Sequence, residues 1–432
     1  MVKILNMEEN NFNTEIKNLV SNKRTFNTEI IKNVSKIISS IESAGDEALR
    51  SLTLQYDNFD IELKGLEVNV ADLEMAYKNC NKDLREALHK SADRIYDFHI
   101  KQIPEDLEYT DNEEIFLGLK WNPLASIGLY VPGGTAAYPS SVLMLAIPAK
   151  VAKIKEVFMC VPCPNGTINN SVLVAAKIAG VDKIYKIGGA QAIAAMALGT
   201  KKIKPVDKIF GPGNAWVTEA KRQLFGKVGI DMIAGPSEIL VIADQKNDPY
   251  WIAADLLSQA EHDESSQSIL VTDHKDFAYK VINNVNKILE NLPRKNIAKI
   301  SWDNNSFVLI VRSLDDAVRM TNDIAPEHVE IATEKPELLS KHINNAGAIF
   351  LGRYTPEAIG DYIAGPNHVL PTSGSARFSS GLSTQDYMKR STIMKCNEDS
   401  VFKIGKDAIK IAKSEGLDAH VLSMELRTSN KL

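Results

Sequence analysis

From residue 125 onward the chain alternates short apolar runs with stretches of helical periodicity, and this alternation limits the fold more than any other feature. Apolar runs near 126–130, 156–160, 183–187 and 207–210 are typical of strands, and helices are expected between them. Strands that alternate with helices form parallel sheets whose two faces are covered by helices. The sequence therefore predicts an α/β protein with a doubly wound parallel sheet in this part.

A second unit of the same kind follows it. Its strands are expected at 238–243, 267–273, 307–311, 328–332 and 347–351, and its helices at 249–261, 275–290, 314–323 and 338–345. Because 432 residues exceed what one core normally serves, we predict two Rossmann-like, doubly wound parallel-sheet domains. Their ranges are 125–237 and 238–380, after a helical N-terminal region over 1–124. The tail, 381–432, is too short to form its own core, so we expect it to dock elsewhere, such as on a partner subunit.

Three strands of the first unit end in glycine-containing turns that lead into helices. The turns are Val131-Pro132-Gly133-Gly134, Gly188-Gly189-Ala190-Gln191 and Gly211-Pro212-Gly213-Asn214. None has the GxGxxG spacing of the usual dinucleotide fingerprint, and each alone is more simply an ordinary strand–helix turn. Ligands of such sheets bind at the carboxyl ends of the strands, and helix N-termini favour phosphate. Together, the three turns favour a cofactor crevice with Tyr130, Gln191 and Asn214 at their tips.

Charge, hydropathy and cysteine content argue against several classes of protein. The formal net charge of −5 gives no basic surface of the kind that binds nucleic acid. No apolar run is long enough to cross a membrane, and the first residues lack the apolar core of a signal peptide. The low cysteine content fits a reducing cytoplasm. Cys160 and Cys163 form a CxxC without a second cysteine pair, so we interpret them as a strand end and loop rather than a zinc site.

Two polar side chains share one face of the helix expected at 249–261. Gln259 and His262 are three residues apart and could present a carbonyl oxygen and an imidazole to one metal ion. With Asp361 and His420 they would supply nitrogen and oxygen ligands that suit zinc. The spacing matches no local zinc motif, so the alternative of ordinary satisfied polar residues stays open.

A carboxylate and an imidazole follow Pro326 directly, as Glu327 and His328. Such a pair suits general base catalysis. The alternative is a solvated pair at a helix–strand junction, and chemistry alone does not decide between the two.

Eight longer motifs, in order and spread over nearly the whole chain, resemble those of the histidinol dehydrogenase family. They are Tyr130-Val131-Pro132-Gly133-Gly134, the run from Lys186 to Ala195, Gly211-Pro212-Gly213-Asn214, Ala234-Gly235-Pro236-Ser237-Glu238, Gln259-Ala260-Glu261-His262-Asp263, Ala325-Pro326-Glu327-His328, the run from Gly365 to Thr372, and Glu415-Gly416-Leu417-Asp418-Ala419-His420.

The resemblance implies two successive NAD-dependent oxidations that convert L-histidinol through L-histidinaldehyde to L-histidine. It implies that His328 is the general base and that Glu327 activates water for the second oxidation. It also implies a homodimer in which the tails are exchanged, so that His420 acts in the site of the neighbouring subunit. One zinc ion per subunit would be held by Gln259, His262, Asp361 and His420.

The resemblance assigns the remaining site residues as well. The positions expected to contact NAD are Tyr130, Gln191 and Asn214. The positions expected to contact the substrate are Ser237, Gln259, His262, Glu327, His328, Asp361, Glu415 and His420. From the residues alone, a metal-dependent hydrolase and a non-enzymatic nucleotide-binding regulator remain as alternatives. A hydrolase would not need the nicotinamide crevice, and a regulator would not need Glu327 and His328 as a pair.

Overall fold

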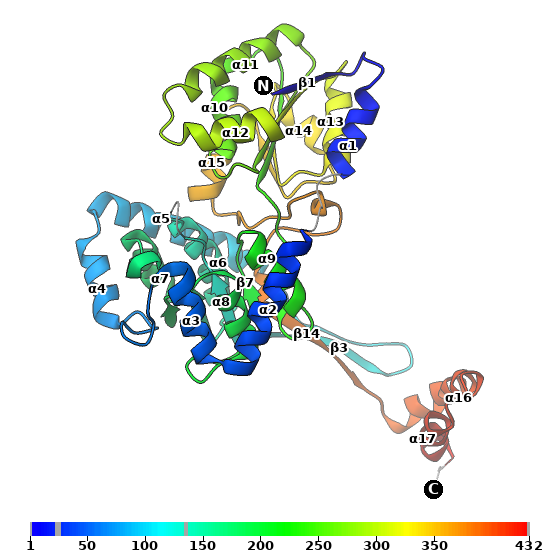
Figure 1. Ribbon diagram of the computed structural model, residues 1–432. Helices are drawn as coiled ribbons and strands as arrows, with labels where there is room; N and C mark the ends of the chain where they lie inside the picture. The colour runs from blue at the N-terminus through cyan, green and yellow to red at the C-terminus, as the bar shows by residue number, and fades with distance from the viewer. Residues whose placement is uncertain (1, 22–26, 134–136, 430–432) are drawn as a thin grey trace.

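The computed structural model describes residues 2–21, 27–133 and 137–429. Two α/β bodies lie one above the other, and an arm carries the C-terminal helices away from them (Figure 1). The predicted glycine turn after 130 is described only in part, because Gly134 lies outside these residues.

The first body contains a parallel five-stranded sheet in the order β6-β5-β4-β7-β8. Its strands are β4 (Ser126–Tyr130), β5 (Glu156–Cys160), β6 (Lys183–Tyr185), β7 (Lys208–Phe210) and β8 (Gly229–Ile230). The helices between them are α6 (Pro139–Val151), α7 (Asn170–Ala179), α8 (Gly189–Leu198) and α9 (Ala215–Leu224). Every residue of β4 is buried, as expected for the central strand of a parallel sheet covered on both faces.

The second body contains a parallel six-stranded sheet in the order β1-β11-β10-β9-β12-β13. Its strands are β1 (Lys3–Asn6), β9 (Glu238–Ala243), β10 (Gln267–Thr272), β11 (Phe307–Ile310), β12 (His328–Ala332) and β13 (Ala348–Leu351). Its helices are α10 (Pro249–Ala260), α11 (Lys275–Leu289), α12 (Lys295–Asn305), α13 (Leu314–Ile324) and α14 (Pro336–Ser340). Of these elements, β1 and α12 were not predicted.

Both sheets are wound in the same way. In the first sheet β4 is central, with β5 and β6 to one side and β7 and β8 to the other. In the second sheet β9 takes the place of β4, with β10 and β11 to one side and β12 and β13 to the other, and β1 is added at the edge beside β11. The strand order therefore reverses between β4 and β7 in one sheet and between β9 and β12 in the other. This confirms the predicted doubly wound α/β class, and such switch points are where these folds bind ligands.

The N-terminal region is helical, as predicted, but it divides between the two bodies. Its helices are α1 (Phe12–Ser21), α2 (Thr28–Ala44), α3 (Asp46–Asp57), α4 (Val70–Asn79) and α5 (Lys82–His99). Phe12 and Ile16 of α1 pack in the second body beside β1. Val34 and Ile37 of α2 pack in the first body against α8. This region also contains two unpredicted strands, β2 (Leu107–Thr110) and β3 (Phe116–Pro123).

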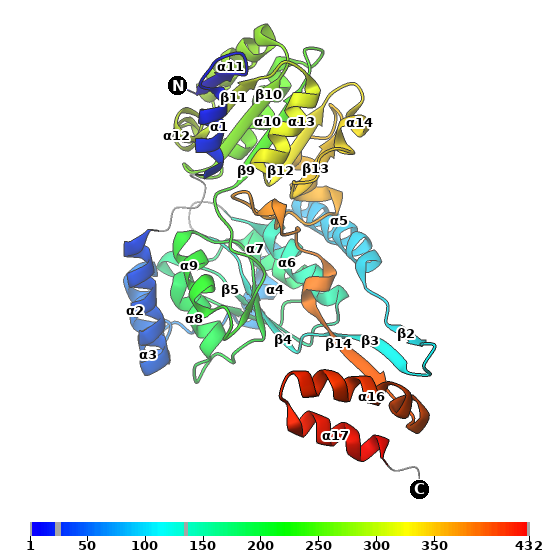
Figure 2. The same ribbon diagram turned by 90° about the vertical axis from the view of Figure 1, so that its right-hand side faces the viewer.

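The arm is a three-stranded antiparallel sheet in which β14 (Met388–Lys395) pairs with β3, and β3 with β2. It ends in two helices, α16 (Glu398–Ser414) and α17 (Asp418–Thr428), which pack on each other at the end farthest from the second body (Figure 2). Docking of this tail on a partner stays a prediction. Among the residues described, no helix combines the length and apolar character needed to span a membrane.

The two bodies meet where the carboxyl edge of the first sheet faces the amino edge of the second. The chain crosses between them in the segment from Ile230, the end of β8, to Glu238, the start of β9. The hydroxyl of Ser141, in the first turn of α6, lies 3.3 Å from Nε2 of His368 in the second body. Polar residues from both bodies therefore meet at this junction.

Candidate active site

His328 is the first residue of β12, and its imidazole is held in one orientation. The ring is 3 % exposed, and its Nδ1 lies 3.0 Å from the carbonyl oxygen of Glu238 on the neighbouring strand β9. A carbonyl oxygen can only accept, so Nδ1 carries the proton and donates. In the neutral ring, Nε2 then carries the lone pair, and it has no hydrogen-bond partner among the described residues. The structure thus presents an unprotonated nitrogen for base or ligand chemistry.

The surroundings favour the neutral form of His328. Burial lowers its pKa, and this effect outweighs the negative charge of Asp361, which acts in the opposite direction. The ordinary value of 6.5 already leaves most of the imidazole neutral near pH 7. A ring with a lowered pKa is therefore ready to accept a proton at that pH.

Glu327 is fixed beside this ring by the same neighbouring strand. Its Oε2 accepts a hydrogen bond of 2.9 Å from the backbone N–H of Glu238. The same oxygen lies 3.7 Å from Nδ1 of His328. Because Glu238 holds both side chains, through its N–H and its C=O, the start of β9 positions the carboxylate and the imidazole as a unit.

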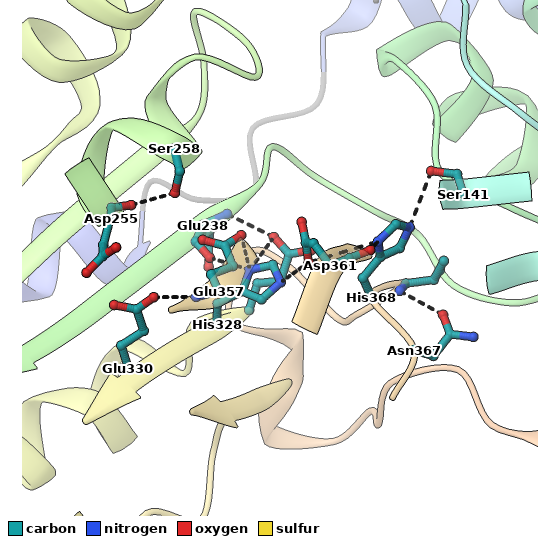
Figure 3. Close-up of polar contacts among 12 residues, drawn as sticks. Ser141, Glu238, Asp255, Ser258, His328, Glu330, Glu357, Asp361, Asn367 and His368 are labelled. Atoms are coloured by element: carbon teal, nitrogen blue, oxygen red, sulfur yellow. Dashed lines mark hydrogen bonds and ion pairs between the residues drawn. The ribbon is translucent and has the colours of Figure 1, made fainter. Parts of the chain in front are cut away.

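Asp361 and Glu357 complete a cluster around His328. One ligand atom from each of the three residues lies within 4.8 Å of the other two (Figure 3). Oδ1 of Asp361 is 3.7 Å from Nε2 of His328 and is also without a hydrogen-bond partner among the described residues. Burial, followed by the charges of Asp361, Glu330 and Glu327, raises the pKa of Glu357 well above its ordinary range. Buried carboxylates with unpaired atoms are stabilised by a cation, and oxygen and nitrogen donors suit zinc.

The segment that carries Asp361 is a π-helix, η4 (Gly360–Ala364), anchored to the N-terminal region. The guanidinium of Arg94 on α5 donates to the carbonyls of Ile363 (2.6 Å) and Ala364 (3.0 Å). Gly365 ends the segment at a φ of 112°, and a Cβ there would lie 2.7 Å from the Arg94 carbonyl oxygen. Helix α5 thus sets the position of Asp361, and π-helical turns often occur at functional sites.

Gln259 and His262, two of the predicted zinc ligands, lie at the end of α10 beside this cluster. The amide nitrogen of Gln259 donates to Glu357, at 2.7 Å to Oε1 and 3.3 Å to Oε2, in the orientation that avoids opposing oxygens. Its carbonyl oxygen is then turned away from that carboxylate. Burial lowers the pKa of His262, against the charge of Asp361, so this imidazole is also neutral and close to Asp361.

His420 and Glu415, predicted to act in the site, lie elsewhere within this chain. His420 is an exposed residue of α17, and Glu415 is an exposed residue at the end of α16. Both helices lie at the end of the arm, away from the junction of the two bodies (Figures 1 and 2). Ser237, by contrast, directly precedes β9 and is half-buried at the junction.

The three predicted NAD positions gather at the carboxyl edge of the first sheet. Tyr130, the last residue of β4, is 3 % exposed, and its hydroxyl accepts from the backbone N–H of Gly189 at 3.0 Å. Gln191 is buried in the first turn of α8. Asn214 is exposed and caps α9, its side-chain oxygen accepting from Trp216 N (3.1 Å) and Val217 N (3.2 Å). Tyr130 therefore holds the turn before α8, Gln191 is buried beside it, and Asn214 presents an exposed amide.

Glu357 and His368 belong to the site but were not among the predicted residues. Glu357 is 3 % exposed and precedes Asp361 by four residues, a spacing that places two side chains on one helix face and could have revealed it. His368 lies in the run from Gly365 to Thr372, which is one of the motifs of the family resemblance, but no role was predicted for it. Its Nδ1 donates to the carbonyl oxygen of Asp361 at 3.0 Å, which ties it to the site.

The chain matches the family model of histidinol dehydrogenase over residues 20–428. It is 50 % identical to histidinol dehydrogenase 1 of Nostoc sp., over 98 % of both chains, and 52 % identical to histidinol dehydrogenase of Rhodospirillum rubrum, over 95 % of this chain and 94 % of that one. The crystal structure of histidinol dehydrogenase from Elizabethkingia anophelis is similar, with a TM-score of 0.93 and 36 % identity over 99 % of this chain and 98 % of that one. The chain therefore belongs to the histidinol dehydrogenase family and is an oxidoreductase.

Proposed function

We propose that this protein oxidises L-histidinol to L-histidine through L-histidinaldehyde, in two successive steps that each reduce one NAD. The observation that carries the proposal is the fixed, neutral His328, whose unprotonated Nε2 lies 3.7 Å from Asp361 at the junction of the two bodies. Oxidation of an alcohol requires removal of its hydroxyl proton, and this nitrogen can accept it. Membership in an oxidoreductase family argues against the hydrolase and regulator alternatives.

The protein's residues account for both steps. In the first, Nε2 of His328 takes the hydroxyl proton while the carbinol carbon loses a hydride and the aldehyde forms. NAD, when bound, takes the hydride. Before the second step water must add to the aldehyde, and Glu327, held beside His328 by Glu238, takes a proton from that water. Once His328 has released the first proton to solvent, it takes the remaining hydroxyl proton of the hydrated aldehyde as the second hydride leaves, which yields the carboxylate.

The donor set around His328 fits a bound zinc ion. The neutral imidazole of His262, the carboxylate of Asp361 and the amide oxygen of Gln259 offer the nitrogen and oxygen ligands that zinc accepts. We assign Gln259, His262 and Asp361 as ligands from one chain and His420 as the ligand from the partner subunit. Zinc, when bound, would hold the imidazole and amine of the substrate and so fix its carbinol carbon. Glu357 would then orient Gln259 without binding the metal itself, because its Oε1 accepts a 2.7 Å hydrogen bond from the Gln259 amide nitrogen.

A homodimer with exchanged tails would supply the missing ligand. Helices α16 and α17 leave large apolar side chains in water, among them Ile411 (62 % exposed), Leu422 (55 %) and Leu426 (62 %). Burial of such side chains on a second copy is favourable. That arrangement would bring His420 and Glu415 to the site of the partner, where Glu415 and Ser237 would contact the substrate.

The test is to incubate the purified protein with L-histidinol and NAD and to follow reduced nicotinamide by absorbance and histidine by chromatography. We expect two molecules of reduced cofactor for each histidine formed, and loss of activity after zinc is removed by a chelator. Readdition of zinc should restore it. Absence of NAD reduction in the zinc-loaded protein would refute the proposed function.

A further inference from the structure

A buried ion pair lies beneath the turn that follows β7. Lys221 of α9 and Asp231, just after β8, form an ion pair whose side chains are 3 % and 1 % exposed. Nζ of Lys221 also donates to the carbonyl oxygen of Gly211 at 2.9 Å. Asp231 accepts from the backbone N–H of Gly211 at 2.7 Å and from that of Met232 at 2.6 Å. Both charged groups are thus engaged by one another and by the backbone.

The pair engages both backbone polar groups of a single residue, Gly211. This residue has a φ of 115°, and a Cβ there would lie 2.0 Å from the carbonyl oxygen of Tyr130. Only glycine fits a position where the backbone approaches the end of β4 so closely. Asp231 accepts from the N–H of Gly211, and Lys221 donates to its C=O. The two side chains therefore fix the orientation of the peptide groups on either side of Gly211.

Stability alone does not explain a buried charge pair at this place. Desolvation of two charges is costly, and apolar side chains of similar size often stabilise a protein as well or better. An apolar pair could not, however, hold the N–H and the C=O of Gly211 at once. What the ion pair adds is therefore the orientation of the turn that begins at Gly211 and ends at Asn214.

We propose that Lys221 and Asp231 are positioning residues for the cofactor, which orient the turn from Gly211 to Asn214 at the switch point between β4 and β7. The inference rests on the proposed function in one respect, namely that NAD binds at this edge of the sheet. The turn abuts Tyr130 on one side and leads into α9 on the other, where Asn214 caps the helix. Loss of the pair should therefore weaken NAD binding and leave the zinc and histidinol contacts of the second body intact.

The test compares Asp231→Asn, and the neutral double variant Lys221→Met with Asp231→Asn, against the zinc-loaded wild type. Asparagine keeps the size of Asp231 but has one oxygen for its three donors, so one contact with Lys221 or Gly211 is lost. The control is Asp244→Asn, which breaks the partly buried Arg353–Asp244 pair beyond the end of β9, at the opposite edge of the second sheet. Each protein is measured well below its unfolding midpoint.

We expect KM for NAD to rise about tenfold in both Asp231 variants, with little change in kcat at saturating NAD, in KM for histidinol or in bound zinc. The Asp244→Asn control should lower the unfolding midpoint without this rise. Hydrogen exchange of the peptide that covers residues 211–214 should be faster than in wild type only in the Asp231 variants. If both variants fold and show wild-type KM for NAD and wild-type exchange, the positioning role is refuted.

Failure of the proposed function would look different. A wild-type protein that does not reduce NAD with histidinol would refute the proposed function and, with it, the role of the pair in cofactor binding. The exchange rates of residues 211–214 would still decide whether the pair orders the turn.

Discussion

Nδ1 of His328 donates to the carbonyl oxygen of Glu238 at 3.0 Å, and this single bond decides which ring nitrogen faces Asp361. Glu238 also donates its N–H to Glu327, so one residue at the start of β9 holds both groups assigned to catalysis. Because β12 pairs with β9 and His328 lies opposite Ile239, the fold itself places Glu238 beside both side chains.

Glu327→Gln should impair the second oxidation more than the first. The amide can no longer take a proton from water, whereas the alcohol step depends on His328. We expect turnover on the aldehyde to fall about 10²-fold, with a smaller loss in the first half-reaction on histidinol. Single-turnover rates with each substrate provide the comparison. Equal losses on both would argue against a water-activating role.

Zinc content tests whether Glu357 is itself a zinc ligand or only orients the ligand Gln259. Gln259→Ala and His262→Ala should lower bound zinc measured after dialysis, because each removes one of four ligands. Glu357→Gln should retain zinc, since on the proposed arrangement Glu357 only orients Gln259. Loss of zinc in Glu357→Gln equal to that in His262→Ala would instead place Glu357 among the ligands.

Glu330 should make stability depend on pH. It is 3 % exposed, and burial, reinforced by the charge of Asp255, raises its pKa well above 4.5. At a pH above the ordinary pKa of 4.5 but below the raised pKa of the folded state, the folded protein holds a proton that the unfolded chain has lost. Stability therefore falls as the pH rises through this window. Glu330→Gln keeps an oxygen to accept the 2.6 Å hydrogen bond from the Glu357 N–H and removes the titration.

Thermal unfolding of Glu330→Gln and wild type between about pH 5 and about pH 8 tests this linkage. As the pH rises, the unfolding midpoint of the variant should increase relative to that of wild type, by about 2 °C or more across the range. Glu334→Gln, at an exposed ion pair with Lys246, is the matched control and should follow wild type. Parallel profiles for wild type and Glu330→Gln would show that Glu330 carries no such shift.

Mixed dimers test the shared site. His420→Ala lacks the ligand given to the partner, and His262→Ala lacks one from the main body, so each homodimer should be inactive. In a mixed dimer, one site combines an intact body with an intact tail. Activity should therefore return, to at most about half of wild type per mixed dimer. Mixed dimers seen by native mass spectrometry that have no activity would mean that His420 does not act across the interface.

The strands around the site could be predicted because they are continuous apolar runs bounded by glycine and proline. The expected ranges 238–243 and 328–332 coincide with β9 and β12. By contrast, β1 pairs with β11 about three hundred residues away, and no local pattern encodes such a partner. Strand β2 is exposed along its whole length, so it lacks the alternation that would identify it.

The same contrast holds within the site. Glu327 and His328 lie in one of the motifs recognised in the sequence, and the structure brings Asp361 beside them. Glu357 follows Pro356 in a segment without apolar periodicity, and its burial depends on packing against Gln259 and the start of β12. In the sequence, Lys221 and Asp231 look like ordinary surface charges. Only the fold shows that their side chains are buried and hydrogen-bonded to the backbone of Gly211.

The most direct test of the central claim is the turnover of His328→Asn with L-histidinol and NAD. Asparagine can still donate to the Glu238 carbonyl, so fold and zinc content should be retained, but it offers no basic nitrogen. We predict a fall in kcat of about 10²-fold or more, with KM for NAD unchanged. A folded, zinc-loaded His328→Asn protein that oxidises histidinol at nearly the wild-type rate would contradict the role of His328 as the base.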